Sequence, residues 1–235
     1  MGSILEVKNV SVSFDKQDVL KNVSFSIDEG DVLAIIGPNG AGKTVLFRAL
    51  MGLIPFDGEI KWRKDIKIGY VPQKLFEKNE LPLTVGEFFT LKSKSLFFTN
   101  KKFTSAVFHE LKSVGLKSSI LDQQLFNLSR GQFQRILIAW AILGHPKILL
   151  FDEPTAGIDL AGEDTIYNLL HKLQNERGLT VLIISHDLNI VYRYADKVLC
   201  LSKGCLYFGE PKKVLTTKHV EHLYGEHAVY YDHIH

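Results

Sequence analysis

One glycine-rich segment between a predicted strand and a predicted helix limits the possible folds of this chain more than any other feature. Gly37-Pro38-Asn39-Gly40-Ala41-Gly42-Lys43-Thr44 fits the pattern G-x-x-x-x-G-K-[ST], whose glycines let successive backbone N–H groups turn inward around an anion. Residues 32–36 are all apolar and predict a buried strand before this loop. Leu46, Phe47 and Leu50 share one helical face after it. Because the positive end of that helix dipole adds to the loop, the segment predicts a phosphate-binding site.

Two side chains of this loop carry specific chemistry. Lys43 can reach the β- and γ-phosphates of a nucleotide, and the hydroxyl of Thr44 can ligate Mg²⁺. The alternative interpretation is a glycine turn that carries an incidental lysine. The strand before the loop and the helix after it are the context that the motif requires, so they favour nucleotide binding.

Composition narrows the class of protein that carries this loop. The chain has 235 residues, of which 46% are hydrophobic and 23% charged, as is ordinary for a globular protein. Its formal net charge of +2 gives no case for nucleic acid. Cys200 and Cys205 are too few for a disulfide framework and fit free thiols in a reducing cytosol. The longest apolar run, residues 136–143, is shorter than the about 18 residues of a membrane span, so we expect any span to belong to another chain.

Strand patterns surround the glycine loop. Before it, apolar and polar residues alternate over residues 5–14 and 23–27, which predicts two strands joined by a turn at residues 15–18. After the loop helix, residues 60–62 and 66–71 predict two more strands. The N-terminal part of the chain is therefore predicted to be rich in β-structure.

The sequence pattern changes after residue 73 and later returns to an alternation of strands and helices. Between residues 74 and 128, strand alternation fades and aromatic residues appear among lysines, which predicts a helical insert. Buried strands are then predicted at residues 147–151 and 181–184, with a helix at 161–176 between them. Lys203-Gly204 lies between two short strand patterns and predicts a hairpin.

The strand predicted at residues 147–151 leads directly into two carboxylates, Asp152 and Glu153. Burial of the strand would hold both at its carboxyl end, where α/β sheets place their ligands. Asp152 can hold Mg²⁺, and Glu153 can orient or deprotonate a water molecule. Apolar strands often end in aspartate, so this pattern gains its weight from the phosphate-binding loop.

The segment Leu128-Ser129-Arg130-Gly131-Gln132 follows the helical insert and opens a helix that runs to Leu143. Taken alone, Ser129 is as well explained as an ordinary N-cap residue. Gly144 and Pro146 would end the helix. The glycine loop, the serine segment and the two carboxylates follow one another along the chain in a distinctive order.

With these residues, the chain resembles the ATP-binding subunits of ABC transporters over residues 4–210. The family signature is L-S-G-G-Q, and this chain departs from it at Arg130. Ser129, Gly131 and Gln132 match the signature. Four further residues match family motifs: the adenine-stacking aromatic, the Q-loop glutamine, the D-loop aspartate and the switch histidine, which are Phe14, Gln73, Asp159 and His186.

The resemblance implies an α/β fold of the phosphate-loop NTPase class. Its ABC-type nucleotide-binding domain would span residues 4–210, with a RecA-like core and an N-terminal antiparallel β subdomain. A helical subdomain would be inserted at about residues 75–138. Residues 211–235 would form a histidine-rich C-terminal tail.

The resemblance also implies a mechanism that uses ATP and Mg²⁺. Two copies would stack head to tail, and each would offer its signature residues and Asp159 to the nucleotide held by the other. Thr44, Gln73 and Asp152 would hold Mg²⁺. Glu153, His186 and Gln73 would be the catalytic residues, with Glu153 polarising the attacking water.

The partners implied are a membrane permease, docked in a groove of the helical insert at the cytoplasmic face of the membrane, and indirectly a metal-binding protein. Residues 58–60, 70–74 and 81–85, with the histidine-bearing tail, look like the ATPases of bacterial zinc importers. The predicted function is therefore ATP hydrolysis coupled to import of a divalent metal, with zinc as the predicted ion. Manganese or iron import, a soluble ABC ATPase that acts on ribosomes or DNA, and a nucleotide-binding scaffold without turnover are the alternatives.

The tail carries five of the nine histidines of the chain. His219 and His222 are three residues apart and would share a helical face, and His233 and His235 would share a side of an extended segment. Neutral imidazoles bind Zn²⁺, so one interpretation is a zinc-sensing or zinc-buffering tail. The other is a solvated terminus without a metal role. The fifth histidine is His227.

Overall fold

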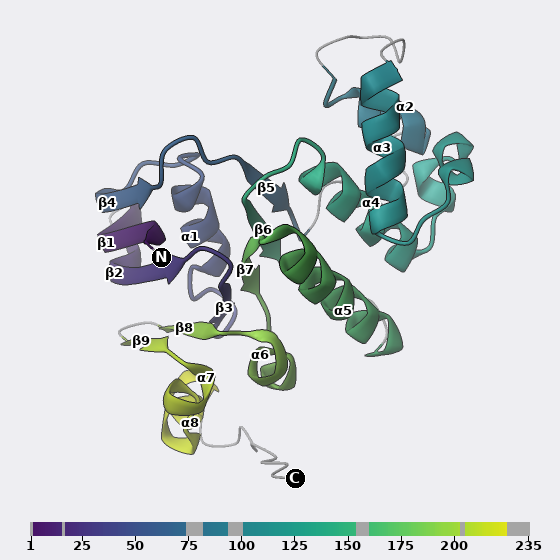
Figure 1. Cartoon of the computed structure of the whole chain (residues 1–235). Coiled ribbons are helices and arrows are strands. Elements are labelled where there is room, and N and C mark those ends of the chain that lie inside the picture. Colours follow the sequence, from purple (N-terminus) through teal and green to yellow (C-terminus); the bar gives the residue numbers. More distant parts are fainter. Residues whose placement is uncertain are drawn as a thin grey trace. The chain divides into compact units, whose positions relative to one another are not determined.

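The computed structural model of the chain describes residues 2–15, 17–73, 82–93, 101–153, 160–202 and 205–224, with side chains left out at 160–164 and 205. The chain divides into two units (Figure 1). The first unit consists of Met1–Ile66 and Thr180–His235, and the second of Lys67–Leu179.

An antiparallel sheet of the first unit has the strand order β2-β1-β4. Its strands are β1 (Ser3–Phe14), β2 (Gln17–Asp28) and β4 (Asp57–Trp62). The predicted alternation is confirmed, since Leu5, Val7, Val10 and Val12 are buried while polar residues lie between them. The turn between β1 and β2 is tighter than predicted, because Phe14 still pairs with Gln17. Asp15 makes this possible with a left-handed φ of 47°.

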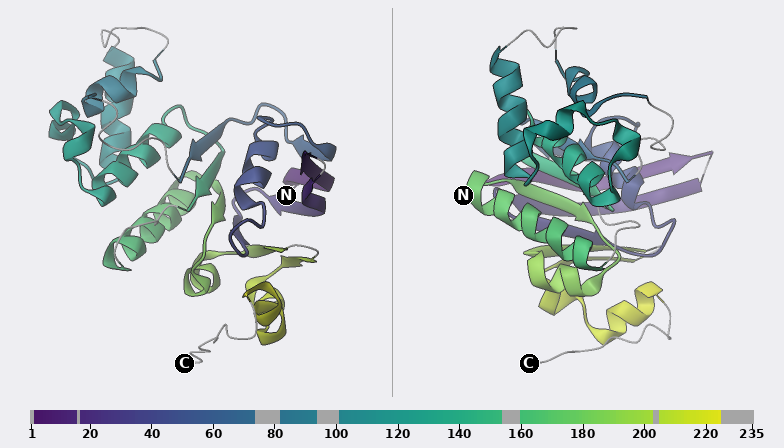
Figure 2. Two further views of the ribbon diagram at one scale, coloured as in Figure 1. Left: turned by 180° about the vertical axis from the view of Figure 1, so that it is seen from behind. Right: turned by 90° about the vertical axis from the view of Figure 1, so that its right-hand side faces the viewer.

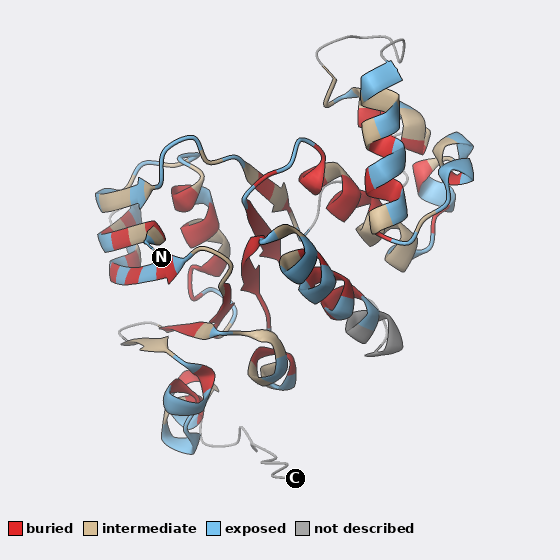
Figure 3. Cartoon of the chain, in the orientation of Figure 1, coloured by how far each residue is buried: buried red, intermediate tan, exposed pale blue. Residues whose placement is uncertain are grey.

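A second sheet of the first unit carries the strands around the glycine loop, in the order β7-β3-β8-β9. They are β3 (Val32–Ile36), β7 (Thr180–Ile184), β8 (Lys197–Ser202) and β9 (Cys205–Gly209). β3 is parallel to β7 and β8, and β8 and β9 form the predicted antiparallel hairpin. Every residue of β3 and β7 is buried (Figure 3). Such continuous apolar runs are typical of parallel strands covered on both faces.

The helices of the first unit follow these strands. They are α1 (Lys43–Leu50), α6 (Leu188–Tyr194), α7 (Pro211–Val214) and α8 (Thr217–Tyr224). The N-cap of α6 is Asp187, whose carboxylate accepts a hydrogen bond from the backbone N–H of Asn189 at 2.8 Å.

The second unit combines a parallel strand pair with helices. β5 (Ile68–Val71) pairs with β6 (Ile148–Asp152), and Tyr70 lies opposite Leu150. The described residues of the unit also form the helices α2 to α5 and two short 3₁₀ helices, and α3 packs against α4 (Figure 2). Their bounds are α2 (Val85–Thr90), α3 (Lys101–Ser113), η1 (Ser118–Asp122), η2 (Leu125–Asn127), α4 (Arg130–Ile142) and α5 (Leu160–Arg177). The predicted helices over 129–143 and 161–176 are confirmed as α4 and α5.

Two charged side chains of the second unit, one buried and one half-buried, have direct partners. The carboxylate of Glu110 on α3 is 1% exposed and pairs with the guanidinium of Arg177 at 2.8 Å. Lys92 donates from Nζ to the carbonyl of Trp140 at 2.5 Å and lies over the indole ring, 4.4 Å from its centroid. Burial lowers the pKa of Lys92 to about 8. Both contacts join segments that are distant in sequence, so they fix the packing of the helices.

The described helices include none that is both long enough and apolar enough to cross a membrane.

Candidate nucleotide-binding site

The glycine loop lies between β3 and α1, as predicted. Lys43 opens α1 and is only 6% exposed. Its ammonium donates to the backbone carbonyls of Gly37 at 2.9 Å and Pro38 at 3.1 Å. A buried positive charge at a helix N-terminus favours a bound anion, because the helix dipole has the same sign there. The loop therefore has the electrostatic features of a phosphate site.

Two glycines of the loop are required by close contacts. A Cβ on Gly37 would lie 2.0 Å from the carbonyl oxygen of Leu201 on β8. A Cβ on Gly42 would lie 2.7 Å from Leu20 Cδ2 on β2, and Gly42 has a left-handed φ of 91°. Strands on both sides thus press on the backbone of the loop, and only glycine fits without displacing them.

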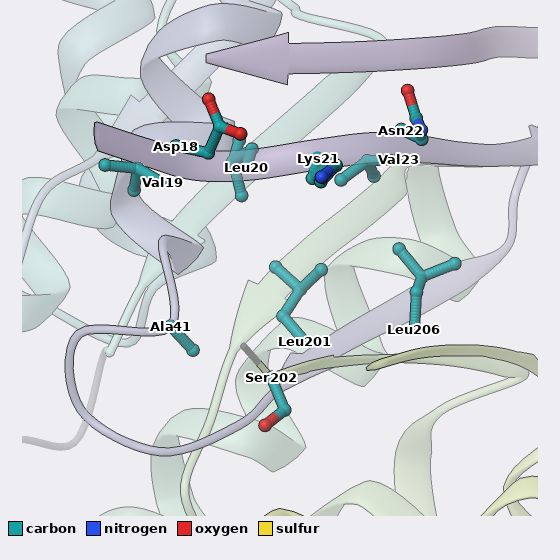
Figure 4. A pocket seen from close by; sticks show the side chains of 10 residues that line it. All are labelled: Asp18, Val19, Leu20, Lys21, Asn22, Val23, Ala41, Leu201, Ser202 and Leu206. Atoms are coloured by element: carbon teal, nitrogen blue, oxygen red, sulfur yellow. The ribbon is translucent and has the colours of Figure 1, made fainter. Parts of the chain in front are cut away.

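A cavity of about 450 Å³ lies beside the loop (Figure 4). Its volume is within the range of small-molecule sites. Ala41 of the loop and residues from β2, β8 and β9 line it; these are Asp18, Val19, Leu20, Lys21, Asn22, Val23, Leu201, Ser202 and Leu206. This lining combines apolar side chains, such as Leu20 and Leu206, with polar ones, such as Asn22 and Ser202, and such a mixture suits a ligand with a ring and hydroxyl groups, such as a nucleoside.

Phe14, the predicted adenine-stacking residue, is 45% exposed at the end of β1. The neighbouring Ser13 donates to Asp18 Oδ1 at 2.7 Å, and Asp18 lines the cavity. The exposed ring and the cavity therefore belong to the same end of the β1–β2 hairpin. An aromatic ring of this size on the surface, rather than in the core, fits a stacking role.

His186 follows β7 and is exposed. Ile35 of β3 pairs with Ile184 of the parallel β7, so Gly37 and His186 are each two residues beyond the same pair. The carboxyl ends of neighbouring parallel strands share one edge of a sheet, which is where α/β folds bind ligands. The structure thus brings the predicted switch histidine to the edge that carries the phosphate loop.

The second unit brings the glutamine and the carboxylates together in the same way. Val71 of β5 pairs with Phe151 of β6, and Gln73 and Glu153 are each two residues further on. The amide Nε2 of Gln73 donates to Glu153 Oε2. The amide nitrogen is engaged in this bond, so Oε1 of Gln73 is the atom that suits a cation. Glu153 has a φ of 48°, a left-handed conformation that is uncommon for a non-glycine residue.

Asp152 is only 2% exposed. The hydroxyl of Tyr70 donates to its Oδ2 at 3.4 Å. Tyr70 is opposite Leu150, so its side chain lies on the same face of the strand pair as that of Asp152, two residues on. Tyr70 is thus a residue of the site that the sequence motifs missed. Tyr70 could have been identified as a site residue only from the parallel pairing of β5 with β6, and no local sequence pattern reveals that pairing.

The signature segment forms the N-terminus of α4. Ser129 is the N-cap, and its hydroxyl accepts a hydrogen bond from the backbone N–H of Gln132 at 3.1 Å. The side chain of Gln132 in turn accepts from the N–H of Ser129 at 3.0 Å. A Cβ on Gly131 would meet nothing within 4 Å, and Arg130 is exposed. The capping box orients this turn, and Gly131 leaves its surface open to an incoming group.

Two predictions fall wholly or partly outside the described residues. Asp159 lies there, so its place near a nucleotide stays a prediction. Of the tail histidines, His219 and His222 are described, and both contact Tyr207. Among the described residues, no group of three or more His, Cys, Asp or Glu side chains could hold a metal ion.

Comparisons with known proteins agree with this geometry. The ABC transporter family matches residues 20–156. The zinc import ATP-binding protein ZnuC of Buchnera aphidicola subsp. Schizaphis graminum is 38% identical over 244 residues, which cover 100% of this chain and 99% of that protein. The zinc import ATP-binding protein ZnuC of Photorhabdus laumondii is 38% identical over 229 residues, which cover 97% and 86%.

Solved structures share the fold. A chain from an ABC transporter assigned to the metal-chelate type, in an inward-facing conformation, superposes with a TM-score of 0.85 at 30% identity and covers 95% of this chain and 89% of that chain. The resemblance and the α/β fold class that it implies are both confirmed. With the phosphate loop, the paired carboxylates and the signature helix in place, the chain belongs to the ABC transporter family.

Proposed function

We propose that this chain is the ATP-hydrolysing subunit of an importer for divalent metal ions, with zinc as the transported ion. The observation that carries the proposal is the phosphate loop, where the buried ammonium of Lys43 lies at the N-terminus of α1, directly after the buried strand β3. The loop N–H groups and the helix dipole bind the phosphates of ATP. Phe14 stacks on the adenine.

The residues present fit Mg²⁺ as the cofactor. Thr44, Gln73 and Asp152 offer a hydroxyl, an amide oxygen and a carboxylate, which are the hard oxygen ligands that this ion prefers. The engagement of Gln73 Nε2 by Glu153 leaves the amide oxygen as the donor. When bound, Mg²⁺ would neutralise charge on the β- and γ-phosphates.

Hydrolysis needs a base and groups that position the water. Glu153 accepts a proton from the attacking water, and the Gln73 amide holds the Glu153 carboxylate in one orientation. His186 contacts the γ-phosphate from the edge of the sheet that also carries the loop. Positioning and electrostatics supply most of the rate enhancement in phosphoryl transfer. The contacts proposed for Glu153, Gln73 and His186 are of these two kinds.

The working unit is a head-to-tail dimer. Ser129, Gly131 and Gln132 of one copy, with Asp159, complete the γ-phosphate site of the other. The open surface at Gly131 and the N-terminus of α4 support this role, because both favour close approach of a phosphate. ATP closes the dimer, and hydrolysis reopens it.

The transport function rests on the relatives. Two of them are zinc import ATP-binding proteins that match nearly the whole chain. In this proposal the dimer binds a membrane permease from the cytoplasmic side as a peripheral protein, and a separate metal-binding protein delivers the ion. In this proposal none of the described residues contacts the transported ion. The identity of that ion is therefore tested by growth of cells.

The test is growth of a bacterium that lacks this gene in medium depleted of metal. We expect zinc alone to restore growth, and the intact gene to remove the need for added zinc. The Glu153→Gln variant is the matched control, since it should be made at normal levels yet fail to complement. Rescue by manganese or iron instead of zinc would overturn the choice of metal. Full complementation by Glu153→Gln would overturn coupling to ATP hydrolysis.

A further inference from the structure

The strand β5, which lies beside β6 (Figure 1), offers hydrogen-bond donors to both carboxylates at the end of β6. The hydroxyl of Tyr70 donates to Asp152 Oδ2 at 3.4 Å, and the amide of Gln73, just after the strand, donates to Glu153. The two donors are three residues apart, and their acceptors are neighbours in sequence. One strand therefore contacts both acidic residues of the proposed ATP site.

The backbone that carries Tyr70 is held on two sides. A Cβ on Gly69, the residue before it, would lie 2.7 Å from the carbonyl oxygen of Ala141 on α4. The backbone of β5 thus lies directly against the last turn of that helix. Pairing of Tyr70 with Leu150 of β6 fixes the register of the strand. The hydroxyl of Tyr70 therefore approaches Asp152 from a defined position.

The hydroxyl supplies a donor that carries no charge. Asp152 is only 2% exposed, and a buried carboxylate needs hydrogen bonds or a cation. An ammonium or guanidinium at this place would neutralise the carboxylate and compete with a metal ion for it. A phenol orients the carboxylate and leaves its negative charge available, as partners of metal-binding carboxylates commonly do.

We propose that Tyr70 is a positioning residue for the magnesium site, because its hydroxyl orients the Asp152 carboxylate toward Mg²⁺. This rests on the proposed function, in which Asp152 is a ligand of that ion. Tyr70 acts through Asp152 and contacts neither the ion nor the nucleotide. In this role β5 serves the site twice, since Tyr70 orients the carboxylate for the cation and Gln73 orients the Glu153 carboxylate that serves as the base.

The test is Tyr70→Phe in the full chain, which removes the hydroxyl and keeps the ring. A non-hydrolysable ATP analogue is titrated in a calorimeter, once with EDTA and once with saturating Mg²⁺, and the ratio of the two affinities measures the contribution of the ion. The bond has a charged acceptor but is long, so we expect this ratio to fall about three- to tenfold. The affinity in EDTA should equal that of the parent protein.

Two further variants separate positioning from a general effect on the fold. The hydroxyl of Tyr192 donates to the carbonyl of Leu215 at 2.6 Å, outside the proposed site. Tyr192→Phe is therefore the matched control and should leave the ratio unchanged. Asp152→Asn should lower the ratio by itself. Adding Tyr70→Phe to Asp152→Asn should lower it no further, because Tyr70 acts through that carboxylate.

The outcomes distinguish the role of Tyr70 from the magnesium site itself. An unchanged ratio in folded Tyr70→Phe, with a lowered ratio in Asp152→Asn, overturns the role of Tyr70 and leaves the site in place. A further fall in the double variant, a weaker affinity in EDTA or loss of the fold in Tyr70→Phe also overturns it. If Asp152→Asn keeps the parent ratio, the magnesium site of the proposed function is wrong, and the role of Tyr70 fails with it.

Discussion

Replacing Lys43 by alanine tests the phosphate site most directly. The Nζ atom of Lys43 is buried and makes hydrogen bonds of 2.9 and 3.1 Å to two carbonyls of its own loop. Its charge therefore lies where few water molecules screen it. A hydrogen bond to a charged group contributes about 1.5–3 kcal/mol, and a bound γ-phosphate would accept at least one from this ammonium. The expected loss is about 2.7 kcal/mol, which weakens ATP binding about 100-fold.

The assay is a titration of the folded variant with ATP, ADP and AMP. Because Lys43 reaches the β- and γ-phosphates, ATP and ADP should lose affinity while AMP should not. Lys43→Arg is the control that retains the charge, and melting temperatures verify the fold. Near-normal ATP affinity in folded Lys43→Ala would refute the reasoning. An equal loss for AMP would show instead that the loop had collapsed after its carbonyls lost their donor.

The remaining predictions concern the carboxylate, the signature and the tail. Glu153→Gln should bind ATP but stall hydrolysis, because the amide is a very poor base, and ATP should then hold the protein as a dimer in light scattering; a monomer at saturating ATP and Mg²⁺ contradicts the assignment. Arg130→Gly should keep ATPase activity within a few-fold of the parent, since the capping box of α4 is untouched; a loss of about 100-fold, or about 2.7 kcal/mol of barrier, would show that Arg130 stabilises the transition state. If the tail buffers zinc, the full chain should take up Zn²⁺ at micromolar concentration, and a variant with His227, His233 and His235 changed to asparagine should not. Equal uptake in calorimetry would leave those three histidines without a metal role.

Local patterns predicted the parts of the site that lie within one short segment. The glycine loop between β3 and α1 and the N-cap at Ser129 are encoded by neighbouring residues, so their structures could be predicted. The carboxylates after β6 were predicted because an apolar strand followed by two acidic residues occurs in the same chain as a phosphate-binding loop. Each of these features depends on backbone conformations that the segment itself favours.

Contacts between distant segments could not be predicted in this way. Tyr70 and Asp152 are 82 residues apart and meet only because β5 pairs with β6 in one register. The need for glycine at position 42 comes from Leu20 on β2 as well as from the left-handed φ of the loop itself. A motif states which residue types occur together, but the register of the sheet decides which of them touch.

The histidines of the tail show how a correct period can lead to an incomplete interpretation. The spacing of His219 and His222 predicted a shared helical face, and α8 presents both toward Tyr207. Periodicity establishes that two side chains face the same way, but it does not say what they face. Here the partner is an aromatic ring on β9, and His219 Nδ1 also hydrogen-bonds with the carbonyl of Val214 at 2.7 Å. A metal ion that recruited these two imidazoles would have to displace Tyr207 and loosen α8. Zinc binding by His219 and His222 would therefore compete with the contacts that hold His219 against Tyr207 and Val214.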